Sequence, residues 1–414
     1  MGLRAYTQRM STTLALAMAL SSHAAIAQDE PLPYENATLL NRAAQLTHRF
    51  LVADTHIDVP YRIYDHWQDV TQSATGNFDL PKAQEGGLNL PFMSIYLPWH
   101  TEVDGTAYAL ANRLIDQVEA IVYRDPDHFG IPHSSGEVER LMKGGKIALA
   151  MGMENGAAIA GKVENLEHFH ERGIRYITLA HSRSNHISDS SYDQHRPWQG
   201  LSPFGQKLIP AMNRIGMMVD VSHISDDAFW EVMEISEAPV IASHSSVRHF
   251  TPDWERNMSD EMIQALAKNG GVIMINFGSS FISKASNDNH GTYAKARSGF
   301  MEQAGIQDTH DPRVEAFTKT YREKTPFVYA TVEDVADHID HVVELVGIDY
   351  VGLGSDFDGV GDSLPVGLKD VSMYPSLVAV LLHRGYKTED IEKILGGNFM
   401  RVWKAVEAFA VQGH

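Results

Sequence analysis

Histidine and carboxylate residues follow the short apolar segments of this sequence. The first such segment ends in His56-Ile57-Asp58, and the two-residue period of a strand places both polar side chains on one side. An imidazole beside a carboxylate is half of the ligand set of a first-row metal ion. A third candidate, Glu154, ends another apolar segment and needs a counter-charge there, which a metal ion supplies.

Further apolar segments end in the same residue types and supply His181, His223, His244 and Asp356. A single histidine at a strand end is usually a hydrogen-bonded structural residue. Several such groups buried together without partners would each cost several kcal/mol, whereas a bound metal removes that cost. The combination of strand ends therefore predicts a metal site.

The number of candidate ligands indicates two ions. One catalytic zinc ion needs only three protein ligands. The five best candidates include a carboxylate able to bridge, and they fit two ions about 3.5–4 Å apart. They are His56, Asp58, Glu154, His223 and His244. Such a pair lowers the pKa of a bridging water toward ~7 and polarises a carbonyl, so we expect hydrolysis at a carbonyl or phosphoryl centre.

The composition agrees with a globular enzyme that uses histidine and carboxylates. The 414 residues are 43% hydrophobic, which is enough apolar material for a large core. The absence of Cys excludes disulfides, thiolate metal sites and Cys nucleophiles. With 34 Lys and Arg against 53 Asp and Glu, the net charge of −19 disfavours binding to nucleic acid or to anionic lipid.

The segments that must position these residues alternate between strand and helix. Eight short, nearly continuous apolar runs are typical of strands buried on both faces. They are residues 50–59, 88–98, 147–153, 174–180, 217–221, 240–243, 272–277 and 350–354. Helical stripes lie between them, and Thr331 with Asp334 predicts a capping box. This rhythm predicts an α/β fold, a (β/α)8 TIM barrel.

A doubly wound open sheet is the rival fold, but it would normally carry a glycine-rich phosphate loop after the first strand, and none is present. We expect one barrel domain over residues 28–414. Residues 283–324 are polar and charged, which predicts a helical, solvent-facing insertion after the seventh strand, with a lid as the alternative. Residues 370–409 predict a helical C-terminal tail.

The first 27 residues have the pattern of a secretory signal peptide. Arg4 and Arg9 precede an apolar run at 12–20, and Ala25-Ile26-Ala27 forms a small-residue cleavage site. A membrane anchor is the alternative, but the run is short for one. We therefore expect cleavage near Ala27 and a secreted, periplasmic protein without a membrane anchor.

The ordered set of motifs resembles the membrane dipeptidase (renal dipeptidase) family of the amidohydrolase superfamily, from about residue 50 to residue 406. The shared stretches are Asp54-Thr-His-Ile-Asp58, Gly200-Leu-Ser-Pro-Phe-Gly205, Ser243-His-Ser-Ser246, Arg256-Asn257, Val351-Gly-Leu-Gly-Ser-Asp-Phe-Asp-Gly359 and Leu395-Gly-Gly-Asn-Phe-Met-Arg-Val-Trp403. The resemblance implies a zinc-dependent metallopeptidase that hydrolyses dipeptides by attack of a metal-bridging hydroxide.

The same resemblance implies the arrangement of the metal ligands. His56 and Asp58 would hold one zinc ion, His223 and His244 would hold the second, and Glu154 would bridge both. This gives two Zn²⁺ per chain, although mixed histidine and carboxylate sites also accept manganese or cobalt. The resemblance further implies small dipeptides as the binding partners and a homodimer as the assembly.

Roles for three more residues follow from the resemblance. Asp356 would act as general base and then general acid, with Asp358 as the competing choice. His181 would stabilise the oxyanion, and Arg256 would bind the C-terminal carboxylate of the substrate. All three residues would therefore contact the substrate.

The sequence departs from the family at two places that could line the side-chain pockets. Gly278 follows Asn276-Phe277 where many members carry Tyr, and residues 88–92 replace a stretch that is often glycine-rich. Dipeptides with a C-terminal D-residue are an expectation from bacterial relatives. Another binuclear amidohydrolase (a lactonase, amidase or esterase) is the alternative function, and a non-catalytic metal- or peptide-binding protein is a third.

Overall fold

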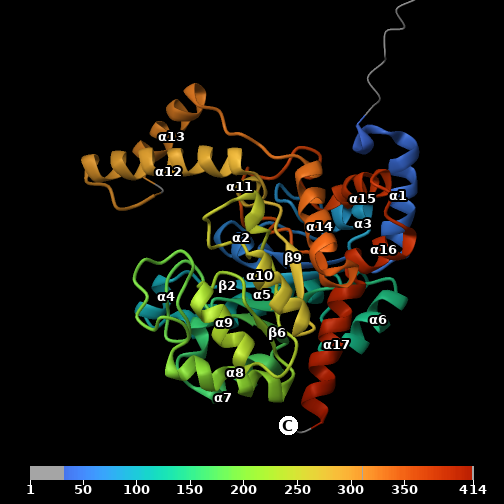
Figure 1. The fold of residues 1–414 in the computed structure, drawn as a ribbon, viewed down its shortest axis with the longest axis horizontal. Coiled ribbons are helices and arrows are strands. Elements are labelled where there is room, and N and C mark those ends of the chain that lie inside the picture. The colour runs from blue at the N-terminus through green and yellow to red at the C-terminus, as the bar shows by residue number, and fades with distance from the viewer. Residues whose placement is uncertain (1–31, 310, 413–414) are drawn as a thin grey trace, which may run out of the picture.

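The computed structural model describes residues 32–309 and 311–412, so the predicted signal peptide lies outside the described residues. Eight parallel strands form a closed barrel in the order β1-β10-β9-β8-β7-β6-β5-β2 (Figure 1). Their bounds are β1 Ala53–Ile57, β2 Leu90–Tyr96, β5 Ala150–Glu154, β6 Ile174–Thr178, β7 Met218–Asp220, β8 Ile241–Ala242, β9 Val272–Ile275 and β10 Val351–Leu353. The predicted TIM barrel is confirmed, and each strand lies within its predicted run except β5, which extends one residue further, to Glu154.

Helices surround the barrel and follow its strands. The first group is α1 Ala37–Arg49, α2 Val59–Asp65, α3 Leu80–Gly86, α4 His100–Val103, α5 Ala107–Arg124, α6 Ser135–Lys143, α7 Val163–Glu171, α8 Pro203–Ile215 and α9 Asp226–Ile235. The second group is α10 Asp260–Lys268, α11 Ser279–Ile282, α12 Lys284–Ala304, α13 Pro312–Lys324, α14 Val332–Val346, α15 Tyr374–His383, α16 Thr388–Glu392 and α17 Asn398–Val411. None of the helices in the described part of the chain is both long and apolar enough to cross a membrane.

The strands are apolar because both of their faces are buried, and every residue of β1, β5, β6 and β9 is buried. Phe92 on β2 lies inside the barrel against Tyr176 on β6 and packs edge-on against Phe399 and Trp403 of α17. The C-terminal helix therefore closes one end of the barrel, and the other end is left for the functional residues.

One predicted strand is divided in the structure. Residues 147–153 were predicted as a single strand, but Ile147–Ala148 forms β4, which pairs with β3 (Phe129–Gly130), and only β5 enters the barrel. The Leu149 N–H donates to the Gly130 carbonyl at 2.8 Å, so the chain is still bonded to β3 where it turns toward the barrel. A strand pair of two residues each is too short to produce a periodic hydrophobic pattern in the sequence.

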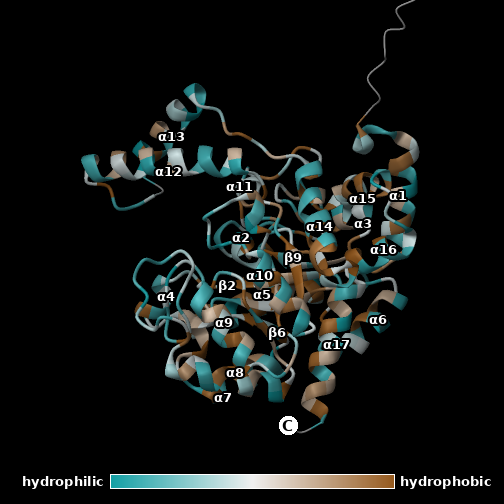
Figure 2. Ribbon diagram, in the orientation of Figure 1, coloured by the Kyte–Doolittle hydropathy of each residue, from teal (hydrophilic) through white to brown (hydrophobic). Residues whose placement is uncertain are grey.

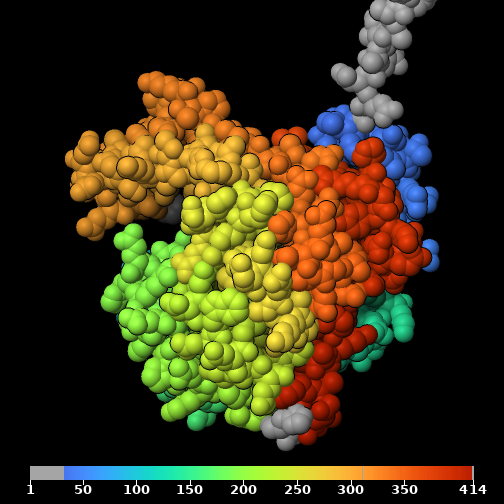
Figure 3. Space-filling view, in the orientation of Figure 1, coloured from blue at the N-terminus to red at the C-terminus, as the bar shows by residue number. Residues whose placement is uncertain are grey.

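The predicted capping box of α14 is present, with Thr331 and Asp334 bonded reciprocally. The polar insertion after the seventh barrel strand forms α12 and α13, which project beyond the barrel (Figures 1 and 3). Figure 2 shows these two helices as largely hydrophilic or mixed, in contrast to the hydrophobic strands of the barrel. The predicted C-terminal tail is helical and includes α15, α16 and α17.

Candidate metal centre

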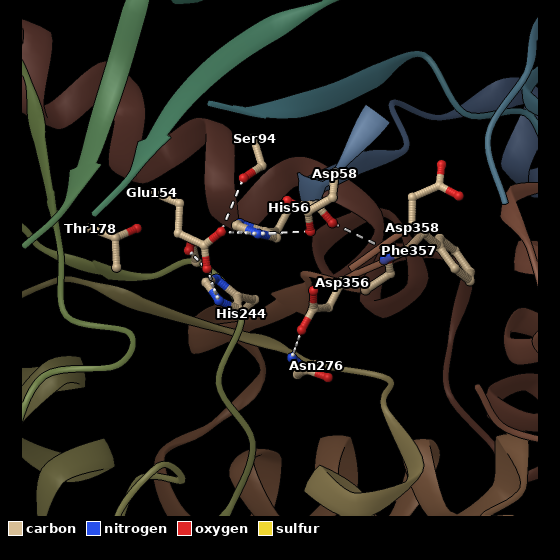
Figure 4. A network of polar contacts seen from close by, with 12 residues as sticks. His56, Asp58, Ser94, Glu154, Thr178, His244, Asn276, Asp356, Phe357 and Asp358 are labelled. Atoms are coloured by element: carbon tan, nitrogen blue, oxygen red, sulfur yellow. Dashed lines mark hydrogen bonds and ion pairs between the residues drawn. The ribbon is translucent and has the colours of Figure 1, made fainter. Parts of the chain in front are cut away.

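The predicted ligands converge at the carboxyl ends of the barrel strands, because parallel strands deliver all these ends to one mouth of the barrel (Figure 4). His56 lies on β1 and Glu154 is the last residue of β5, whereas the others lie in the turns just after a strand. Three groups of residues each place their ligand atoms within 4.8 Å of one another, and the first group shares one residue with each of the other two. They are His56, Glu154 and His244; Glu154, His181 and His223; and His56, Asp58 and Asp356.

Glu154 lies at the centre of this arrangement. Its Oε2 atom is 3.4 Å from His56 Nε2, which in turn is 3.4 Å from Asp58 Oδ2. Its Oε1 atom is 3.1 Å from His223 Nε2 and 3.3 Å from His244 Nε2. The two oxygens of one carboxylate thus face different histidines, as a ligand that bridges two ions requires, and the His56 and His244 rings stack with centroids 3.7 Å apart.

Burial lowers the pKa of His56, but Tyr176, Glu154 and Asp58 outweigh burial and raise this pKa well above its usual value. The hydrogen bonds behind the ring fix which nitrogen carries the proton when the ring is neutral. The Tyr176 hydroxyl donates to the Thr55 carbonyl at 2.9 Å, so its oxygen is free to accept from His56 Nδ1 at 3.1 Å. With the proton on Nδ1, the Nε2 atom of a neutral ring carries a lone pair toward Glu154 and Asp58. This Nε2 is buried and has no hydrogen-bond partner among the described residues.

His244 is held in the same way by a second relay. The Ser243 hydroxyl donates to Asp220 Oδ2 at 2.6 Å and accepts from His244 Nδ1 at 2.7 Å. The Nε2 lone pair of His244 then faces His223 Nε2 at 2.8 Å. Asp220 is fully buried and is also bonded to Thr178, so the serine is firmly oriented. The relay aims a metal-binding nitrogen at the cluster.

This donor set fits a zinc ion or another first-row divalent cation. Burial, followed by Arg256, lowers the pKa of His223 well below its usual value, and burial, followed by His56, lowers that of His244. The rings are therefore neutral, which is the form that binds a metal ion. Neutral imidazole nitrogens and carboxylate oxygens without any thiolate are typical zinc ligands, although manganese and cobalt use the same set.

Asp356 lies beside the cluster and is held by one side-chain hydrogen bond. Asn276 Nδ2 donates to Asp356 Oδ2 at 2.8 Å, which holds one carboxylate oxygen. Burial raises the pKa of Asp356 to about 7, with His56 opposing this and Asp58 adding to it. A carboxyl group with a pKa near neutrality can both accept and release a proton at working pH.

Asp358, the competing choice for this role, is committed elsewhere. Its Oδ2 atom is 3.1 Å from Arg62 Nε, and its Oδ1 atom accepts the Asn77 N–H at 2.7 Å. Its carboxylate therefore holds the wall of the cavity together. The geometry favours Asp356 as the acid–base residue.

The backbone at the centre adopts a conformation that side chains normally avoid. His223, Asp356 and Asp358 have φ angles of 70°, 64° and 65°, and Asn155 beside Glu154 has 75°. Each such residue costs of order 1–3 kcal/mol and persists only where its surroundings hold it. Concentration of this strain at one mouth of the barrel is typical of a functional site.

A cavity of about 700 Å³ lies over the cluster and is lined by Asp58, Glu154, His181, His223 and Asp356. His181 Nε2 is 3.4 Å from Glu154 Oε1, and burial lowers the pKa of His181, so a neutral ring faces the cavity. This size is within the range of about 300–1,000 Å³ that is usual for small-molecule sites.

Arg256 reaches the same site from the loop after β8. Its side chain is 2% exposed, and its two terminal nitrogens donate to Ser245 Oγ at 2.9 Å and to the His244 carbonyl at 2.7 Å. One of them also lies 3.1 Å from His223 Nε2. The buried Nε has no hydrogen-bond partner among the described residues, so the guanidinium keeps a donor for an acidic group.

Several contributors to the site were not predicted from the sequence. Tyr176 and Asp220 lie behind the candidate ligands and do not line the metal cavity, and Asn276 was noted only for Gly278, two residues further on. Tyr192 lines the cavity from the long loop after β6, and its ring centroid is 5.7 Å from that of His223. The polar strand ends could have drawn attention to Asp220 and Asn276, whereas no local signal marks Tyr192.

Comparison with known proteins identifies the family to which this chain belongs. Residues 40–414 match the family model described as membrane dipeptidase (Peptidase family M19). The chain is 35% identical to dipeptidase tcpJ of Claviceps purpurea over 84% of this chain and 74% of the relative. It is 30% identical to mouse dipeptidase 3 over 89% of this chain and 67% of the relative.

Solved structures share the fold. The probable dipeptidase PvdM from Pseudomonas aeruginosa superposes with a TM-score of 0.77 at 28% identity, covering 90% of this chain and 99% of that one. A metallopeptidase from Rhodobacter sphaeroides, solved with a phosphinate mimic of the dipeptide L-Ala-D-Ala, superposes with a TM-score of 0.70 at 24% identity, covering 86% and 99%.

Proposed function

The chain belongs to the membrane dipeptidase family and is a metal-dependent dipeptidase, and from this premise we propose that it works with two zinc ions. The observation that carries the proposal is the division of the Glu154 carboxylate between His56 on one side and His223 with His244 on the other. Two zinc ions held there would lower the pKa of a water between them and polarise the scissile carbonyl.

The residues of the chain would then move the proton. Asp356 takes the proton from the attacking water and passes it to the leaving amine, for which its raised pKa and the Asn276 hydrogen bond suit it. His181 lines the same cavity and would donate a hydrogen bond to the developing oxyanion. The strained backbone at Asp356 supports a fixed orientation for this transfer.

Arg256 would bind the C-terminal carboxylate of the substrate. Its guanidinium is buried beside His223 and keeps one free donor, Nε, which can form a charge-assisted hydrogen bond with a carboxylate. A fixed clamp at this depth explains a preference for dipeptides over longer peptides, because a longer chain would have to continue past the clamp.

The proposal is tested with a panel of L,L and L,D dipeptides, a neutral ester and a chelator. We expect turnover of dipeptides that the chelator abolishes. Arg256→Leu should raise KM strongly for dipeptides and leave hydrolysis of a neutral ester nearly unchanged. Equal loss on both substrates would contradict the carboxylate clamp, and turnover by metal-free protein would contradict the mechanism.

We propose further that dipeptides with a C-terminal D-residue are substrates, as the panel tests, and that the protein is exported. Export is supported by the charged start, the apolar run and the Ala25-Ile26-Ala27 pattern. N-terminal sequencing of protein recovered from the periplasm should begin at residue 28. A mature protein that retains residues 1–27 would contradict cleavage.

A further inference from the structure

A second cavity adjoins the metal cavity. It has a volume of about 1030 Å³ and shares four lining residues with the first, namely Tyr192, Phe281, Gly359 and Val360. Its far wall is formed by the insertion, with residues of both α12 and α13. An unsubstituted dipeptide has no need of two adjoining cavities of this size, since a single small-molecule site usually measures about 300–1,000 Å³.

The second cavity has aromatic walls and a cation within them. Arg322 of α13 lies over the Tyr293 ring at 4.2 Å and over the Phe327 ring at 5.3 Å, and its Nη1 donates to Asn289 at 2.8 Å. Tyr329 lines the same wall. Arg322 is therefore half-buried, with its guanidinium against two aromatic rings.

No carboxylate of the described residues forms an ion pair with Arg322, although the chain carries a net charge of −19. His290 also lines the cavity, and burial, with help from Arg322 and Arg297, lowers its pKa. The carboxylate that lines this cavity, Asp362, accepts the Tyr329 hydroxyl at 2.9 Å and leaves Arg322 without an ion pair. A partly buried guanidinium without an acidic partner suits an anionic group on a ligand.

The junction between the two cavities lies beside Arg256. The Phe281 ring is 5.2 Å from the Arg256 guanidinium carbon, and Tyr192 lies between His223 and Trp254. If Arg256 binds the α-carboxylate of the substrate, the side chain of the substrate's C-terminal residue passes beside Phe281 and Tyr192. The C-terminal residue is therefore the one whose side chain is directed to the second cavity.

We propose that the second cavity binds the side chain of the C-terminal residue and selects dipeptides in which that side chain is large, aromatic and negatively charged at its end. This inference rests on the proposed dipeptidase function. The aromatic walls would stack on the ring, and Arg322 would pair with its charge. The insertion is then a specificity element, and the barrel performs the chemistry.

The test compares three substrates, alanyl-alanine, alanyl-phenylalanine and alanyl-(4-carboxyphenylalanine), on the full-length metal-loaded protein. We expect kcat/KM to rise in that order. Arg322→Gln should raise KM for the carboxyphenylalanine substrate by about tenfold or more, with kcat and alanyl-alanine hydrolysis unchanged. Arg313→Gln is the matched control, since Arg313 lies on the same helix, is exposed and pairs with Asp311.

Arg322 also connects α13 to α12, so its replacement could change the structure of the insertion. A second variant separates this structural effect from an effect on substrate binding. Tyr329 is 37% exposed, so Tyr329→Leu should fold normally and reduce the preference for both aromatic substrates. Equal changes on all three substrates, or no preference in the wild type, would overturn the inference while alanyl-alanine turnover upheld the proposed function. Failure to hydrolyse any of the three would overturn both.

Discussion

The mouth of the barrel and the insertion above it are built on different principles. Every residue of β1 and β5 is buried, and the candidate ligand His56 on β1 is held from behind by Tyr176. His244, after β8, is held in the same way by Ser243 and Asp220. In contrast, the 21-residue α12 buries only Ser286 and Tyr293, and α13 buries only Val314 among its described side chains. The candidate ligands thus lie at the ends of buried strands, while the part that we assign to selectivity lies on helices that bury few side chains.

The largest effect should come from the acid–base group. Asp356→Asn keeps the size of the side chain and removes its proton transfer, so we expect kcat to fall by about 10²–10⁴-fold with the metal content unchanged. Asp288→Asn on α12 is the matched control, because Asp288 is an exposed carboxylate of the insertion paired with Lys284. A variant with normal kcat would remove Asp356 from the mechanism.

Loss of a hydrogen bond behind a candidate ligand should weaken metal binding nearly as much as loss of the ligand itself. Ser243→Ala removes the acceptor that holds the Nδ1 proton of His244, so metal affinity should fall by about 10–100-fold. Ser298→Ala, an exposed position on α12, serves as the control. If competition with a chelator showed equal zinc affinity for both variants, the hydrogen bonds behind the candidate ligands would not support metal binding. The proposed difference between the barrel mouth and the insertion would then be contradicted.

His338 on α14 marks the boundary between the regions. Its Nδ1 accepts the Val247 N–H at 3.0 Å, and its Nε2 donates to the Ile282 carbonyl, also at 3.0 Å, so it ties the loop after β8 to the root of the insertion. Burial lowers the pKa of His338 to about 3. Between pH 6.5 and about 3, the unfolded chain therefore binds a proton at His338 that the folded chain does not bind. The contribution of the neutral ring to the free energy of unfolding is complete above pH about 6.5 and is lost as the pH falls toward 3.

His338→Gln keeps a donor and an acceptor but cannot titrate. Its free energy of unfolding should therefore fall less steeply below pH 6.5 than that of the wild type, by up to about 1.4 kcal/mol for each pH unit. Urea unfolding at pH 7, 5.5 and 4.5 measures both slopes. Parallel curves would contradict a neutral buried imidazole.

The smallest effect on activity should come from within the insertion. Phe300 of α12 stacks on Phe317 of α13 with ring centroids 4.6 Å apart. Phe317→Ala should speed amide hydrogen exchange in α12 and α13 and leave β1, β5 and alanyl-alanine turnover unchanged. Faster exchange in the strands as well would show that the two regions unfold together.

The sequence alone predicts the parts of the molecule that leave a local signal. The apolar strands and the polar residues that end them, such as His56 and Glu154, carry both the barrel and the candidate ligands. Once the fold is a barrel, the convergence of these residues follows from its parallel strands.

The remaining parts depend on contacts between distant segments. Tyr176 meets His56 across 120 residues and Asn276 meets Asp356 across 80, and nothing local marks either pair. Aspartate tolerates the positive φ of Asp356 better than most residues do, but nothing in the local sequence requires that conformation. The second cavity likewise exists only where α12 and α13 meet the barrel mouth.

The central claim is that one carboxylate, Glu154, joins two metal sites at the barrel mouth. The most direct test removes all metal, adds back zinc in known equivalents and follows dipeptide hydrolysis. The account predicts that activity is absent without zinc and reaches its maximum at two equivalents per chain. Full activity at one equivalent, or in the metal-free protein, would contradict it.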